Sequence, residues 1–176
     1  FCKKKSLRMY IELILNSIDC SFFEKQGDFM RKDFIINIVG TQYVDGEMDK
    51  VEIMTLGHYT VKNGTRYIMY KEYPEENRQS EKTTIVKVEN ENKVSIIRAG
   101  EYQSRLLLEK GRRHQCHYRT LAGDLMIGVF TENIATDLHD DGGKLDVSYS
   151  LDFNADFASK NEFHIDIKRA NTALEL

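Results

Sequence analysis

Residues 123–157 read GDLMIGVFTENIATDLHDDGGKLDVSYSLDFNADF, and this stretch decides the fold class. Its second half alternates between apolar and polar side chains without interruption. The apolar positions are Leu145, Val147, Tyr149, Leu151 and Phe153, and the polar positions are Asp146, Ser148, Ser150, Asp152 and Asn154. A period of two residues is typical of a β-strand with one buried face. The stretch therefore predicts two long antiparallel strands that turn around residues 140–143.

The turn of this hairpin is compatible with two registers. With Gly142-Gly143 at its centre, Leu138 would lie opposite Val147. With Asp141-Gly142 at its centre, Leu138 would lie opposite Leu145. Both registers pair apolar with apolar side chains, whereas a slip by one residue would pair apolar with polar ones.

Composition describes an ordinary globular protein of one domain. The chain has 176 residues, of which 41% are hydrophobic and 30% charged. Its formal net charge of −3 is small and negative, so we expect neither nucleic acid nor a membrane surface as a partner. Nine tyrosines, nine phenylalanines and a single proline, Pro74, favour β-structure.

Cysteine usage predicts a reducing compartment. The three cysteines, Cys2, Cys20 and Cys116, are an odd number and show no C-x-x-C spacing. Neither a disulfide framework nor a structural zinc site is expected from them, and we expect no cofactor. Free thiols are typical of the cytoplasm, where we expect the protein to be located.

Residues 1–29 differ in pattern from the rest of the chain. Apolar residues recur at helical spacing at Leu7, Tyr10, Ile11, Ile14, Leu15 and Ile18. Three interpretations are open: a helix that packs on the domain, an amphipathic helix for a membrane or partner, or an over-long gene prediction with Met30 as the true start. We favour the third, because the codons of residues 25–28 would be purine-rich, like a ribosome-binding site. We therefore expect an N-terminal extension at 1–29, one domain at 30–170 and a tail at 171–176.

Turn signals divide the domain into about ten strands. The expected strands are residues 33–44, 49–61, 65–72, 83–89, 93–99, 102–109, 112–120, the two strands of the opening stretch, and 162–169. Asn63-Gly64 is the strongest hairpin signal, and Gly57 inside a strand predicts a bulge or bend. Successive hairpins predict an all-β antiparallel meander, and closure into a barrel would remove its free edges. A two-sheet sandwich is the alternative.

Several short motifs are spread along the domain. They are Gly40-Thr41-Gln42, Gly57-x-Tyr59, Asn63-Gly64-x-x-Tyr67-Ile68-x-Tyr70-x-Glu72, Ile97-Arg98-x-Gly100, Glu109-x-Gly111, Tyr118-x-Thr120-x-x-Gly123 and Asp141-Gly142-Gly143-Lys144-Leu145. Together they resemble the motifs of the YwiB-like family of small bacterial β-barrel proteins (domain of unknown function 1934). The resemblance spans residues 31–169, and Arg105, Cys116 and Arg112-Arg113 depart from it. It implies a calycin-like (lipocalin-like) barrel of about eight to ten strands in the cytoplasm, with a start near Met30. It implies no activity, because none is established for the family.

Motifs for catalysis or metal binding are weak. His114 and Cys116 share one face of a strand, but two ligands are too few for a tetrahedral metal site. Asp137, His139 and Asp141 alternate beside a glycine turn, where a polar hairpin tip is the simpler interpretation. The chain contains no G-x-S-x-G motif. We therefore assign no catalytic and no metal-binding residue.

The remaining candidate is a ligand site in the barrel mouth. Arg98 interrupts an apolar strand, and Tyr70, Glu72 and Tyr118 could converge with it on a small apolar or amphipathic ligand. Alternatively, Arg98 extends outward and the tyrosines only pack. A non-enzymatic binding protein is thus our first hypothesis. The others are an interaction protein, dimeric through a sheet face or edge, and an enzyme with an unrecognised site.

Overall fold

The structure is a computed structural model that describes residues 34–72, 82–99, 104–120, 123–153 and 156–170. At residues 72, 82, 104, 117–120 and 123–125 it describes the backbone alone. The expected extension at 1–29 and tail at 171–176 lie outside the described residues. No helix long and apolar enough to cross a membrane occurs in the described ranges.

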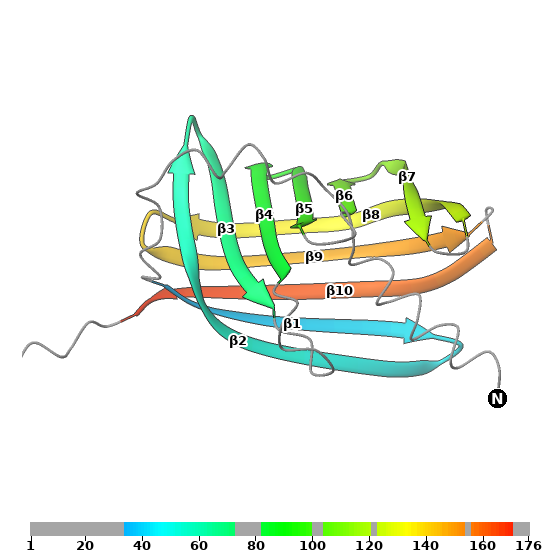
Figure 1. Cartoon of the computed structure of the whole chain (residues 1–176), viewed down its shortest axis with the longest axis horizontal. Helices are drawn as coiled ribbons and strands as arrows, with labels where there is room; N and C mark the ends of the chain where they lie inside the picture. Colours follow the sequence, from blue (N-terminus) through cyan, green and yellow to red (C-terminus); the bar gives the residue numbers. More distant parts are fainter. Residues whose placement is uncertain (1–33, 73–81, 100–103, 121–122, 154–155, 171–176) are drawn as a thin grey trace, which may run out of the picture.

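Ten β-strands make up the described part of the chain (Figure 1). They are β1 (Phe34–Val44), β2 (Glu47–Lys62), β3 (Thr65–Glu72), β4 (Lys82–Asn90), β5 (Lys93–Ala99), β6 (Ser104–Glu109), β7 (Arg113–Thr120), β8 (Gly123–His139), β9 (Gly142–Phe153) and β10 (Asp156–Arg169). The expected number and order of strands are confirmed. The last strand begins earlier than the predicted residue 162, a difference that matters for the site.

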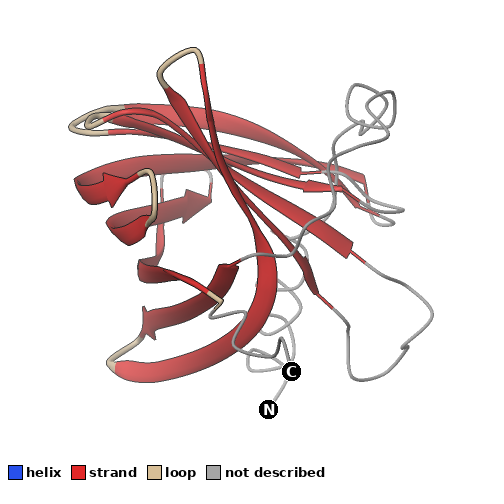
Figure 2. Ribbon diagram, turned by 90° about the vertical axis from the view of Figure 1, so that its left-hand side faces the viewer, coloured by secondary structure: helices blue, strands red, loops and turns tan. Residues whose placement is uncertain are grey.

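All ten strands belong to one antiparallel sheet, in the order β6-β5-β4-β3-β2-β1-β10-β9-β8-β7. The sheet curls into a nearly closed barrel, as Figure 2 shows. Its two end strands, β6 and β7, are consecutive in the chain, and the turn that joins them bonds to β8. The Gly111 N–H donates to the Thr131 carbonyl at 2.8 Å, and the Thr131 N–H donates to the Arg112 carbonyl at 3.1 Å. The prediction of an all-β antiparallel barrel is therefore correct.

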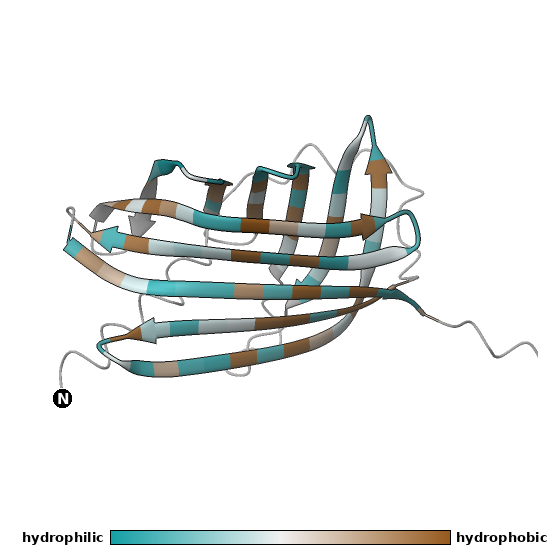
Figure 3. Cartoon of the chain, turned by 180° about the vertical axis from the view of Figure 1, so that it is seen from behind, coloured by the Kyte–Doolittle hydropathy of each residue, from teal (hydrophilic) through white to brown (hydrophobic). Residues whose placement is uncertain are grey.

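The inner face of the barrel carries the core. Apolar and polar residues alternate along the strands in Figure 3, and the buried apolar residues form one core cluster. Apolar side chains that are almost completely buried are Ile36, Ile68, Val86, Val94, Leu108, Val129, Leu145, Ile165 and Ile167. The predicted inward face of β9 is confirmed, since Leu145, Val147 and Leu151 are buried.

The predicted registers of the β8–β9 hairpin are both wrong by at least two residues. Its central turn residues are Asp140-Asp141, and Leu138 lies opposite Gly143. The physical reason lies in the two glycines that begin β9. A Cβ atom at Gly142 would collide with the Ile167 carbonyl, and one at Gly143 with the Asp137 carbonyl. The glycines are needed where neighbouring backbones approach, so they do not form the centre of the turn.

The β2–β3 hairpin turns as predicted, because Asn63 and Gly64 both have positive φ, at 52° and 77°. Gly57 marks a bend rather than a bulge. It pairs in unbroken register with Phe34 of β1 and Tyr70 of β3, and β2 curves strongly there in Figure 1. Through this bend, one strand contributes to two walls of the barrel.

Candidate functional site

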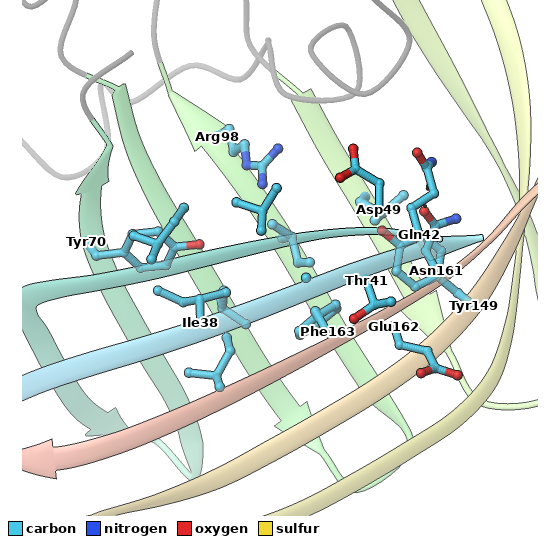
Figure 4. A pocket seen from close by; sticks show the side chains of 17 residues that line it. Ile38, Thr41, Gln42, Asp49, Tyr70, Arg98, Tyr149, Asn161, Glu162 and Phe163 are labelled. Atoms are coloured by element: carbon cyan, nitrogen blue, oxygen red, sulfur yellow. Dashed lines mark hydrogen bonds between the residues drawn. The ribbon is translucent and has the colours of Figure 1, made fainter. Parts of the chain in front are cut away.

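A cavity of about 240 Å³ occupies one end of the barrel interior, toward the ends of β3 and β5 (Figure 4). Its apolar lining residues include Ile38, Val51, Ile53, Val86, Ile96, Leu106, Phe163 and Ile165. Its polar lining residues include Thr41, Gln42, Asp49, Tyr70, Arg98, Tyr149, Asn161 and Glu162. The cavity is thus both apolar and polar, and the two kinds of residue lie in separate layers.

Gly40 explains why this part of the interior is hollow. It lines the cavity from β1, on the same strand face as Ile36 and Ile38. A Cβ atom placed at Gly40 would meet no atom within 4 Å. A larger residue at this position would extend into the cavity. Glycine within a strand is otherwise unfavourable, and it often marks a place where a ligand approaches the backbone.

One polar row crosses the wall formed by β1, β10 and β9. Gln42 lies opposite Asn161, which lies opposite Tyr149. The Gln42 Nε2 donates to Asn161 Oδ1 at 3.0 Å, and Asn161 Nδ2 donates to Ser159 Oγ at 2.9 Å. These bonds fix the amide groups, because a buried polar group needs a hydrogen-bond partner.

A second polar row crosses the facing wall of β3, β4 and β5. Tyr70 lies opposite Thr84, and Thr84 lies opposite Arg98. Figure 4 shows Tyr70 and Arg98 beside the cavity, with the Arg98 side chain extended into it. The positive charge of Arg98 also acts on Tyr149 of the first row. The two rows therefore face each other across the cavity.

Apolar layers lie beneath both polar rows. The next inward residues on the strands of the second row, two positions along each strand, are all apolar: Ile68, Val86, Ile96 and Leu106. The corresponding residues next to the first row are Gly40, Phe163 and Val147. The cavity consequently has an apolar floor and a ring of polar groups above it, which suits a molecule with an apolar part and a polar end.

Tyr149 contributes a hydroxyl group to this polar ring. Its ring contacts Phe163 edge to face, with centroids 6.4 Å apart. Burial raises the pKa of Tyr149, and the nearby charge of Arg98 offsets only part of that effect. The hydroxyl therefore stays protonated at neutral pH and can donate a hydrogen bond into the cavity.

Of the four residues predicted to bind a ligand, Tyr70 and Arg98 line the cavity. Glu72 ends β3 and Tyr118 belongs to β7, but their side chains lie outside the described part. Ligand binding by these residues stays a prediction. Arg98 points inward as proposed, rather than toward solvent.

Sequence reasoning missed Gly40, Gln42 and Asn161 as lining residues. A glycine inside an apolar strand was a usable signal for Gly40. Asn161 lies just before the expected start of the last strand, so its inward position was hidden by that boundary error. Gln42 could be assigned to the cavity lining only once its partner on β10, Asn161, was known.

The His114 and Cys116 pair has other partners. His114 Nε2 lies 3.0 Å from Glu109 Oε2. Cys116 is buried, and burial raises the pKa of its thiol, which makes it a poor nucleophile. Asp137 and His139 form an exposed pair at 3.0 Å on the hairpin tip. In the described ranges, no three metal-ligating side chains are grouped closely enough to hold an ion.

Comparison with known proteins gives a consistent assignment. A curated relative, the uncharacterized β-barrel protein YwiB of Bacillus subtilis (strain 168), is 29% identical over 107 residues, which are 61% of this chain and 72% of the relative. The crystal structure of the ywiB protein from Bacillus subtilis superposes with a TM-score of 0.69 at 22% identity, covering 84% of this chain and 99% of that one. This likeness shows a shared fold. Residues 36–165 match the family described as a domain of unknown function, DUF1934, and the chain belongs to that family.

Proposed function

We propose that this protein is a non-enzymatic binding protein that holds one small amphipathic molecule in the barrel cavity. The observation that carries the proposal is the layered cavity, with an apolar floor beneath two facing polar rows. Its volume of about 240 Å³ is close to the lower end of ligand pockets, which begin at about 300 Å³, so the molecule is small.

The two layers have different parts in binding. The apolar floor supplies affinity, at roughly 25 cal/mol for each Å² of apolar surface removed from water. The polar rows fix the orientation of the molecule, because Gln42 and Asn161 are already held by hydrogen bonds. No covalent step is needed for this role.

Native mass spectrometry of protein purified from its own host tests the proposal. The natural protein is expected to carry a bound mass, and Gly40→Val is expected to lose it, because the valine side chain enters the hollow. Val39→Ile enlarges the neighbouring residue on the opposite face of β1 and serves as the matched control. An unchanged bound mass in Gly40→Val, or no bound mass in the natural protein, would contradict the proposal.

We also propose that the protein acts in the cytoplasm. The buried free thiol of Cys116 supports this location, and so does the absence of C-x-x-C spacing among the three cysteines of the sequence. Fractionation of host cells, with detection by antibody, checks it.

A further inference from the structure

We propose that the molecule in the cavity is a carboxylate with a short apolar tail, and that Arg98 binds its carboxylate. This inference rests on the proposed function and adds the chemical class of the ligand. The tail would lie on the apolar floor, and the carboxylate would lie at the level of the two polar rows.

Arg98 supplies the charge that selects an anion. Its guanidinium lines the cavity and extends into it (Figure 4). A guanidinium is always charged in proteins, and its fork of N–H donors matches the two oxygens of a carboxylate. An ammonium group would be repelled at the same place.

Tyr149 supplies a second donor from the facing wall. Its hydroxyl stays protonated, and the Arg98 charge acts on it across the cavity. A group held between a guanidinium and a phenolic hydroxyl receives hydrogen bonds from both sides. Such a group must be an acceptor, and charge-assisted bonds make an anionic acceptor the better one.

The acidic side chains of the lining already have neighbouring donors. Asp49 Oδ1 accepts the Lys50 N–H at 2.9 Å. Glu162 Oε1 lies 3.3 Å from Lys160 Nζ, and the Glu162 side chain is 44% exposed at the rim. A carboxylate ligand would therefore lie at Arg98, away from these two acidic side chains.

The depth of Arg98 decides the orientation of the ligand. On β5, Ile96 is the next inward residue beneath Arg98, and it pairs with Val86 of β4 and Leu106 of β6. A tail attached to a carboxylate at Arg98 would therefore contact these three apolar side chains.

Three probes with one tail and different head groups test the inference: octanoate, 1-octanol and octylammonium. Binding to the full chain is measured by calorimetry and by NMR shifts of residues that line the cavity. We expect octanoate to bind about tenfold tighter than 1-octanol, the effect of one charge-assisted contact, and octylammonium to bind weakest.

Substitutions assign the preference to Arg98. We expect Arg98→Met to weaken the binding of octanoate by about tenfold and to leave the binding of 1-octanol unchanged. Arg98→Lys should keep part of the preference for octanoate over 1-octanol. The unchanged binding of 1-octanol shows that the variant is folded. Arg105→Met, on the exposed outer face of the adjacent β6, is the matched control and should change neither affinity. Tyr149→Phe should weaken octanoate by about threefold, because one neutral hydrogen bond is lost.

Two results would overturn the inference. If 1-octanol binds as tightly as octanoate, or if Arg98→Met weakens both equally, Arg98 does not select a carboxylate. Gly40→Val separates this failure from a failure of the proposed function. If Gly40→Val weakens the binding of every probe, the cavity is a binding site whatever its selectivity. If no probe binds, or if Gly40→Val changes nothing, the proposed function fails as well.

Discussion

The two ends of the barrel are made of the same strands but are filled differently. On β1, Ile36 is 0% exposed and packs against the core, whereas Gly40, four residues along on the same face, borders empty space. Val51 also lines the interior, yet it is 55% exposed. The alternation of residues decides which face points inward, but the volumes of the inward side chains decide whether the interior is full.

The packed end is also linked across the barrel. The Tyr59 hydroxyl donates to the His139 carbonyl at 2.7 Å. Arg66 Nη1 donates to Tyr59 Oη at 3.0 Å and to Asp140 Oδ1 at 3.2 Å. These bonds join the β2–β3 hairpin to the β8–β9 turn. At the cavity end, the bond between Gln42 and Asn161 joins neighbouring strands of one wall.

Two isoleucines on β1 give the largest expected loss of stability by a single substitution. Ile36→Ala should lower the free energy of unfolding by about 4 kcal/mol, because it leaves a new void in a packed core. Ile38→Ala should cost only about 1.5 kcal/mol, because its side chain already borders the cavity and loses fewer contacts. Urea unfolding curves of both variants measure the difference. Equal losses would mean that the two ends are packed alike.

Two glycines give the next contrast. A Cβ atom at Gly57 would collide with Ile36 Cδ1 and with the Met69 carbonyl, and the backbone oxygen cannot move aside. Gly57→Ala should therefore cost about 3 kcal/mol. Gly40→Ala meets nothing and removes backbone freedom from the unfolded chain, so it should stabilise the protein by about 0.5 kcal/mol. Thermal unfolding of both variants decides the matter, and a destabilised Gly40→Ala would show that the hollow is smaller than described.

The contrast also explains what could be predicted from the sequence. Period-two alternation in β9 correctly placed Leu145, Val147 and Leu151 inside, because a strand's side chains follow its local geometry. The cavity depends on which residues meet across five or more strands, and local patterns contain no such information. Arg98 was the exception, since a charge inside an apolar strand is conspicuous in the sequence itself.

Errors of register and boundary arose from long-range backbone contacts. Gly142 and Gly143 were expected in the turn, yet they are required by the carbonyls of Ile167 and Asp137. Asn161 was placed outside the last strand because nothing near it in sequence shows that it pairs with Gln42. Both features are fixed by neighbours that are distant along the chain.

Tyrosine titration provides the smallest expected effect and compares the two ends directly. Burial raises the pKa of Tyr59 at the packed end, against the lowering effect of Arg66, and it raises the pKa of Tyr149 at the cavity. Tyrosine in the unfolded chain ionises near pH 10, so above that pH unfolding releases protons and the free energy of unfolding falls as pH rises through the folded pKa. Each buried tyrosine contributes at most about 1.4 kcal/mol per pH unit to this fall.

Tyr59→Phe and Tyr149→Phe should therefore each flatten the alkaline loss of stability, measured by urea unfolding between pH 9 and 11. The flattening by Tyr149→Phe is the informative result, because it depends on how poorly the cavity solvates a charge. An octanoate anion at Arg98 would raise the pKa of Tyr149 further, by like-charge repulsion. Added octanoate should accordingly steepen the alkaline loss in the natural protein and leave the slope of Tyr149→Phe unchanged. An equal change in both proteins would place the bound anion away from Tyr149.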